Sequence, residues 1–145
     1  MARERVVAGR FGILGRVGVG GMGAVYRALD HSTGRLVAVK EIHGLSAEDQ
    51  ERFARECAFL ASLDEPGIVS YVAHGTTDSG SQYLAMEWVD GESLDRWLAQ
   101  PLPLGRALEI GAEIADALDA AHEKGVVHRD VKPANVLMTR TGHPK

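Results

Sequence analysis

The sequence has 145 residues, of which 45% are hydrophobic and 25% are charged, a balance typical of a folded globular domain. Its net charge of −4 argues against an overall basic field of the kind that attracts nucleic acid, so we expect no nucleic-acid partner. The single cysteine, Cys57, excludes an internal disulfide framework and a cysteine-rich zinc site, and it fits a cytoplasmic location. No apolar run reaches the roughly 20 residues of a membrane-spanning helix, so we expect no membrane segment.

The first part of the chain predicts three strands. Residues 1–9 carry charge without an apolar run, and we expect them to form an N-terminal extension. The first strand starts near Phe11 and runs into a glycine-rich turn at residues 18–23. A second strand covers residues 24–29, a polar connection follows, and a third strand covers residues 36–42.

A helix is predicted after the third strand. Ser46, followed three residues later by Asp49, is a capping-box pattern that marks its start. Apolar side chains recur at helical spacing and predict a buried stripe, namely Phe53, Cys57 and Leu60. Glu56 lies three residues after Phe53 and four before Leu60, so we expect its carboxylate to face the interior.

The rest of the chain predicts two more strands and then mainly helix. The expected elements are strands at 68–74 and 82–88, a short helix at 93–98, a long helix at 104–124 closed by Gly125, and a strand at 136–138. We therefore predict an α+β fold in two lobes, of which residues 10–88 form the first and residues 89–145 the second.

The first motif that indicates chemistry is the glycine pattern G-x-G-x-x-G at Gly18, Gly20 and Gly23. Dinucleotide-binding folds use the same spacing, but there the glycines open a helix, whereas residues 24–28 here alternate like a strand. A glycine loop between two strands can close over phosphates because no side chains hold its amides away. A plain glycine-rich hairpin without a ligand is the alternative that this motif alone leaves open.

The second motif is a lysine inside an apolar strand, Val37-Ala38-Val39-Lys40. Burial of an ammonium group is costly unless it is paired. Because Glu56 is expected to face inward from the next helix, the two residues predict an ion pair that would hold the Lys40 ammonium near nucleotide phosphates. A lysine that reaches solvent at the edge of the sheet is the alternative.

The third motif is His128-Arg129-Asp130-Val131-Lys132-Pro133-Ala134-Asn135. It resembles the catalytic loop of protein kinases, H-R-D-x-x-x-x-N, with Lys132 where Ser/Thr kinases usually carry one. With the other two motifs in the same order, residues 10–145 resemble the bacterial eukaryotic-like (Hanks-type) Ser/Thr protein kinases. The resemblance implies a protein-kinase-like fold, with a five-stranded antiparallel N-lobe, one regulatory helix and the start of a mainly helical C-lobe.

The resemblance also implies roles for single residues. Asp130 would accept or orient the proton of the substrate hydroxyl, and Lys132 would stabilise the transferred phosphoryl group. Lys40, held by Glu56, would bind the α- and β-phosphates of ATP, and Asn135 would ligate Mg²⁺. The residues expected to contact ATP are Val17, Gly18, Gly20, Gly21, Gly23, Val25, Ala38, Lys40, Met86, Glu87, Val89, Asn135 and Leu137.

The motifs that follow the catalytic loop in the family do not occur in these 145 residues. The Asp-Phe-Gly motif is absent, although residues 142–145 resemble the approach to it, so we expect the remainder of the C-lobe downstream. The sequence thus predicts ATP-dependent phosphoryl transfer to Ser or Thr of a protein substrate, with little or no transfer by this segment alone. A nucleotide-binding pseudokinase or scaffold remains an alternative, and a non-kinase nucleotide-binding fold is disfavoured by the catalytic loop.

Overall fold

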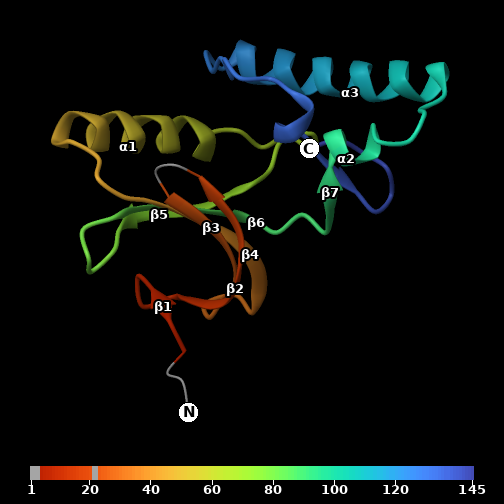
Figure 1. The fold of residues 1–145 in the computed structure, drawn as a ribbon. Helices are drawn as coiled ribbons and strands as arrows, with labels where there is room; N and C mark the ends of the chain where they lie inside the picture. Colours follow the sequence, from red (N-terminus) through yellow and green to blue (C-terminus); the bar gives the residue numbers. More distant parts are fainter. Residues whose placement is uncertain (1–3, 21–22) are drawn as a thin grey trace. The chain divides into compact units, whose positions relative to one another are not determined.

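The computed structural model describes residues 4–20 and 23–145, which form two compact units. The first, here called the sheet unit, consists of the chain up to Ser62 together with Ser70–Trp88. The second, here called the helical unit, consists of Leu63–Val69 and Val89–Lys145. The predicted α+β class is confirmed (Figure 1). Among the described residues, no helix combines the length and apolar character needed to cross a membrane.

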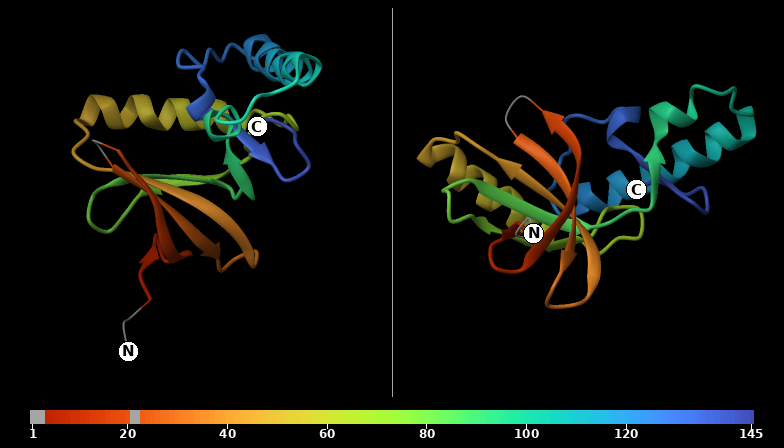
Figure 2. Two further views of the ribbon diagram at one scale, coloured as in Figure 1. Left: turned by 45° about the vertical axis from the view of Figure 1, so that its right-hand side comes forward. Right: turned by 60° about the horizontal axis from the view of Figure 1, so that its bottom comes forward.

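The sheet unit contains one antiparallel sheet of six strands. They are β1 (Val6–Val7), β2 (Phe11–Gly20), β3 (Gly23–Asp30), β4 (Arg35–Ile42), β5 (Tyr71–Thr76) and β6 (Gln82–Glu87). Their order is β1-β2-β3-β4-β6-β5, and the sheet is strongly twisted (Figure 2). Five strands match the sequence-based prediction, and β5 begins three residues later than expected.

The sixth strand, β1, corrects the expected five-stranded sheet, and it lies within the N-terminal extension, residues 1–9. Val6 and Val7 pair with Gly12 and Phe11 of β2, and Val7 is buried in the core. Ala8 between these strands has a φ of +52°, an uncommon conformation for a residue with a side chain, which allows a tight turn. A two-residue strand is too short for the alternation from which strands are predicted.

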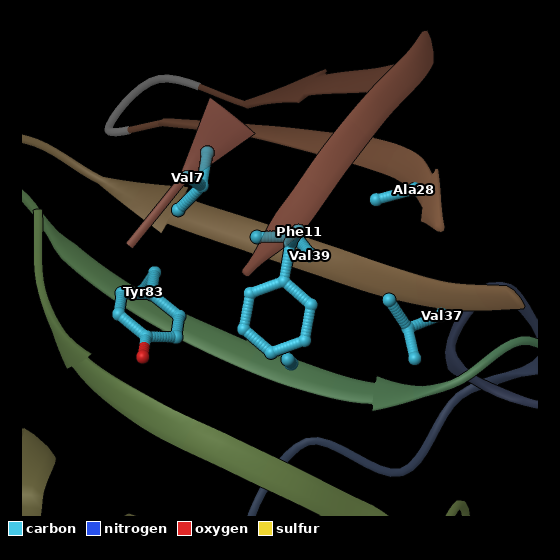
Figure 3. Packing of buried hydrophobic residues seen from close by; sticks show 7 residues of the cluster. Val7, Phe11, Ala28, Val37, Val39 and Tyr83 are labelled. Carbon is cyan, nitrogen blue, oxygen red and sulfur yellow. The ribbon is translucent and has the colours of Figure 1, made fainter. Parts of the chain in front are cut away.

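The core of the sheet unit lies on one face of this sheet. It contains Val7, Phe11, Ala28, Val37, Val39, Tyr83 and Ala85 (Figure 3). The rings of Phe11 and Tyr83 meet edge to face, with their centroids 5.8 Å apart. Because side chains alternate along a strand, the burial of Val37 and Val39 places Ala38 and Lys40 on the opposite face.

Helix α1 (Ala47–Ala61) covers part of the sheet beside β5 (Figure 1). Its predicted N-cap is confirmed, because the backbone N–H of Asp49 donates to Ser46 Oγ at 3.1 Å. Cys57 is the one fully buried residue of this helix. Burial, with a smaller contribution from the charge of Glu56, raises the pKa of the Cys57 thiol to about 11, so the thiol is protonated near neutral pH.

The helical unit contains the other elements, which are β7 (Gly91–Ser93), α2 (Leu94–Trp97), α3 (Leu104–Glu123), a 3-10 helix (Pro133–Asn135) and β8 (Leu137–Thr139). Strands β7 and β8 pair in antiparallel fashion. The buried cluster of this unit consists of Leu94, Ile110, Val136 and Met138. Gly125 follows α3 with a φ of +79°, as expected for a glycine that ends a helix.

Two carboxylates are buried in the sheet unit, and each has an arginine partner. Arg10 donates from Nε and Nη2 to the two carboxylate oxygens of Asp30, at 2.9 and 2.7 Å. The bonds from Arg10, with further ones from Ser32, hold the pKa of Asp30 well below its usual range despite burial. Arg5 donates to the carboxylate of Glu41, which is only 2% exposed. These pairs are needed because a buried unpaired charge is strongly destabilising.

The lowered pKa of Asp30 predicts how stability depends on pH. Because the folded-state pKa lies below the unfolded value, the ionised carboxylate stabilises the fold above the unfolded pKa, and this is lost as pH falls toward the folded pKa. Asp30→Asn should therefore lower the free energy of unfolding by about 1–3 kcal/mol near neutral pH. The difference in the free energy of unfolding between this variant and wild type should become steadily smaller below about pH 4.

Urea denaturation at several pH values, followed by circular dichroism, tests this expectation. Asp78→Asn in the exposed β5–β6 turn is the matched control and should change stability little at any pH. If the free energies of unfolding of wild type and Asp30→Asn differ by the same amount in strong acid as at neutral pH, the role assigned to the Asp30 carboxylate is contradicted.

Candidate active site

The glycine pattern lies at the end of the β2–β3 hairpin. Gly18 pairs with Val25 and Gly20 pairs with Gly23, so both strands continue into the segment predicted as a turn. Gly21 lies outside the described residues. A Cβ atom at Gly23 would come within 1.8 Å of the carbonyl oxygen of Glu41, so only glycine allows β3 and β4 to approach this closely.

The residues predicted around adenine share one face of the sheet with Lys40. Val25 is the cross-strand partner of Lys40, and Ala38 is the partner of Met86. Paired residues of antiparallel strands project to the same side, so these four positions line the face opposite the core. The three apolar residues are half-buried and Lys40 is exposed. The sheet thus presents a small apolar surface with one ammonium group beside it.

The predicted inward orientation of Glu56 is wrong. Glu56 and Lys40 are both exposed, and no ion pair joins them among the described residues. The buried side of α1 is narrow and centred on Cys57, and neighbouring residues of a helix point about 100° apart. The sequence reasoning therefore placed the charge on the wrong side of the buried stripe.

Glu41, which the sequence reasoning missed, is the buried acid nearest to Lys40 in the chain. It follows Lys40 in β4 and projects to the core face, where Arg5 neutralises it. The sequence did indicate that position 41 faces the core, because the alternate inward positions Val37 and Val39 continue to it. An acid at an inward position predicts a buried partner, but not which arginine supplies it.

The end of the sheet unit contains further predicted contacts. Glu87 binds Ser70 twice, since its backbone N–H donates to the Ser70 carbonyl at 2.9 Å and its carboxylate accepts from the Ser70 N–H at 3.0 Å. The guanidinium of Arg27 lies over the ring of Trp88, 5.4 Å from its centroid. Val17 in β2 is exposed. The Glu87 carboxylate therefore has a structural contact with the Ser70 backbone.

In the helical unit, the three predicted catalytic-loop residues lie together. The Lys132 ammonium is 3.5 Å from Asp130 Oδ2. Asn135 Nδ2 donates to the backbone carbonyl of Asp130 at 2.9 Å and to its Oδ2 at 3.1 Å. The structure thus brings a carboxylate, an ammonium and a carboxamide together.

The loop is held by its neighbours in the chain. The 3-10 helix Pro133–Asn135 turns Asn135 back toward Asp130, and Val136, which follows, is buried. The carbonyl of Val136 accepts from the Leu94 N–H at 2.8 Å, which ties the loop to α2. Arg129 has a φ of +66°, a conformation that residues with side chains seldom adopt. The loop is therefore anchored where it ends, at Val136, and has a constrained backbone near its start, at Arg129.

The arrangement has defined chemical capacities. The side chains of Asp130 and Lys132 are 67% and 54% exposed, so an external molecule can reach both. A carboxylate can accept a proton from a hydroxyl group, and an adjacent ammonium can stabilise negative charge on a phosphoryl group.

Of the other predicted contacts in this unit, Val89 and Leu137 are half-buried, and Leu137 exchanges two backbone hydrogen bonds with Lys145, at 2.9 and 2.8 Å.

Asn135 is the one residue predicted to ligate a metal. Its amide nitrogen is directed to Asp130, so Oδ1 remains as a hard oxygen ligand of the type that Mg²⁺ prefers. Among the described residues, no group of three or more His, Cys, Asp or Glu side chains could hold a metal ion. A metal ion at Asn135 would need further oxygen ligands besides Oδ1, because Mg²⁺ takes octahedral coordination.

Comparisons with known proteins identify relatives of the whole chain. A family model described as protein kinase domain matches residues 11–145. The serine/threonine-protein kinase pkn2 of Myxococcus xanthus is 43% identical over 141 residues, which cover 94% of this chain and 17% of the relative. Serine/threonine-protein kinase PknA of Mycobacterium tuberculosis is 39% identical, and the match covers 96% of this chain and 34% of the relative.

A comparison of structures gives the same result. The PknI kinase domain of Mycobacterium tuberculosis aligns with a TM-score of 0.86 and 32% sequence identity. The alignment covers 99% of this chain and 60% of that one. The chain therefore spans only part of the relatives and of the solved domain that it matches.

Proposed function

The chain belongs to the protein kinase domain family, and we propose that the protein containing it transfers the γ-phosphoryl group of ATP to Ser or Thr hydroxyls of protein substrates. The observation that carries this proposal is the cluster of Asp130, Lys132 and Asn135, with the lysine 3.5 Å from the carboxylate. In this proposal, residues 10–88 are the N-lobe and residues 89–145 are the hinge and part of the C-lobe.

The helical unit would supply the chemistry at the substrate hydroxyl. The hydroxyl oxygen forms a bond to the γ-phosphorus while the bond from that phosphorus to the β–γ bridging oxygen breaks, which releases ADP. The hydroxyl proton goes to the Asp130 carboxylate, and Lys132 stabilises the charge on the transferred group. Because phosphoryl transfer needs mainly positioning and charge neutralisation, two charged groups and one amide on an anchored loop suit the reaction.

The sheet unit would supply nucleotide binding. Val25, Ala38 and Met86 form a half-buried apolar surface that suits an adenine ring, and Lys40 on the same face suits the α- and β-phosphates. Backbone groups of Glu87 would bind the adenine edge. The glycine hairpin would cover the phosphates, because Gly18, Gly20 and Gly23 present backbone without side chains.

The residues present also fit a divalent cation, which we propose to be Mg²⁺. When bound with ATP, such an ion neutralises phosphate charge. Asn135 Oδ1 would hold it, because Nδ2 of the same amide is directed to Asp130. Asn135→Ala should then weaken nucleotide binding in the presence of the metal more than in its absence.

A nucleotide-binding scaffold without transfer activity is the second candidate. The observation that favours it is the exposure of both Lys40 and Glu56, which leaves the predicted ion pair unformed. Under this alternative the protein would bind ATP through the sheet unit and act through contacts with other proteins.

Radiolabelled ATP separates the two candidates. The 145-residue chain and the whole protein are each incubated with γ-labelled ATP, Mg²⁺ and a peptide mixture that contains Ser, Thr and Tyr. We expect the whole protein to label Ser and Thr but not Tyr, and a chelator to abolish labelling. Nucleotide binding by the whole protein without transfer to any peptide would favour the scaffold instead.

A further inference from the structure

Both arginines that neutralise the buried acids precede residue 11, where the match to the protein kinase domain model begins. The match begins at residue 11, whereas Arg5 and Arg10 lie before it. Their partners Glu41 and Asp30 lie inside it and are 2% and 1% exposed. Residues 4–10 therefore supply two positive charges, and these neutralise the two carboxylates that the matched segment buries.

Arg5 contacts three neighbouring strands. Its guanidinium donates to the Glu41 carboxylate of β4 at 2.5 Å. The same group lies over the ring of Tyr26 in β3, 4.8 Å from the centroid. Its backbone carbonyl accepts from the Ile13 N–H of β2 at 2.8 Å. One residue thus joins the strands that form the glycine hairpin to the strand that contains Lys40.

The position of Glu41 connects this pair to the nucleotide-binding residues. Glu41 follows Lys40 in β4, and the two side chains project to opposite faces. Glu41 is the cross-strand partner of Ala24, and its carbonyl lies against Gly23 at the root of the glycine hairpin. A Glu41 carboxylate without a partner would have to reach water, and the β4 backbone would have to rotate to allow this. Such a rotation would move Lys40.

We propose that Arg5 is a positioning residue for nucleotide binding. By neutralising Glu41, it holds the β4 backbone at Lys40 and the root of the glycine hairpin in the geometry that grips phosphates. The segment before residue 11 then contributes to the geometry of the site. This inference rests on the proposed function, because it assigns Lys40 to the nucleotide.

The second buried pair provides a matched control. Arg10 and Asp30 form the same kind of pair, but at the opposite end of β3, where Asp30 is the partner of Phe11 and Arg35. Loss of Arg10 should therefore destabilise the sheet without moving Lys40. A purely structural role for Arg5 would make the two arginine variants alike.

Titration of the whole protein with a fluorescent ATP analogue, well below the melting temperature, tests the inference. Arg5→Ala should raise the dissociation constant about tenfold. Arg10→Ala should lower the melting temperature comparably but change affinity less than about twofold. Arg5→Lys should restore part of the affinity, and the double variant Arg5→Ala/Glu41→Gln should bind more tightly than Arg5→Ala, because it leaves no buried charge unpaired.

Amide hydrogen exchange gives a second readout that does not depend on the nucleotide. Arg5→Ala should speed exchange in residues 38–42 and at Ala24, whereas Arg10→Ala should speed it near Asp30. Equal loss of affinity in both variants, or unchanged exchange at residues 38–42 in Arg5→Ala, would overturn the inference. Failure of the wild-type protein to bind the analogue would instead contradict the proposed function. The exchange pattern would then show whether Arg5 holds the β4 backbone at residues 38–42.

Discussion

Replacement of Asp130 by asparagine is expected to lower the rate of phosphoryl transfer by the whole protein by about 10²–10⁴-fold. The amide has nearly the shape of the carboxylate but cannot accept the proton of the substrate hydroxyl at neutral pH. Its oxygen can still accept from Asn135 Nδ2, and the backbone carbonyl at position 130 keeps its own bond, so the loop should retain its structure. Nucleotide affinity should therefore change little.

Steady-state transfer from γ-labelled ATP, together with nucleotide titration, measures both quantities. Asp116→Asn on the exposed side of α3 is the matched control, since it makes the same chemical change away from the loop. Transfer by Asp130→Asn at a rate close to that of wild type would exclude Asp130 as the proton acceptor. A loss of nucleotide affinity as large as the loss of rate would indicate that the substitution disturbs binding instead.

Replacement of Gly23 by alanine is the second large effect that we expect. The new methyl group would lie 1.8 Å from the Glu41 carbonyl oxygen, a backbone atom that cannot move without displacing β4. Separation of β3 from β4 should destabilise the fold by about 1–3 kcal/mol. It should also weaken nucleotide binding, because the displaced strand contains Lys40.

Urea denaturation and nucleotide titration of the same preparation measure this prediction. Gly15→Ala in β2 is the matched control, since a Cβ atom there meets nothing within 4 Å. The control should retain both stability and affinity to a much greater degree than Gly23→Ala. Equal behaviour of the two variants would mean that the approach of Gly23 to β4 is unimportant for the site.

Local patterns in the sequence were sufficient for much of the fold. Alternation along residues 36–42 predicted a strand, and in the structure it places Val39 in the core and Lys40 on the other face. The resemblance of residues 128–135 to a kinase catalytic loop implied related roles for Asp130, Lys132 and Asn135, and in the structure the three residues lie within hydrogen-bonding or ion-pair distance. These features depend on residues close in the chain, where strand and helix periods fix the direction of each side chain.

Partners that come from distant parts of the chain could not be predicted in this way. Helical spacing placed Glu56 inward, yet the packing of α1 beside β5 leaves it exposed. The buried acid is Glu41, and its partner Arg5 lies 36 residues away, in a segment too short to be recognised as part of the sheet. Neighbouring residues thus specify the strands, the helix cap and the catalytic loop. Which charges are buried, and which arginines neutralise them, depends on how strands far apart in sequence pack, because desolvation is a property of the folded surroundings rather than of the local sequence.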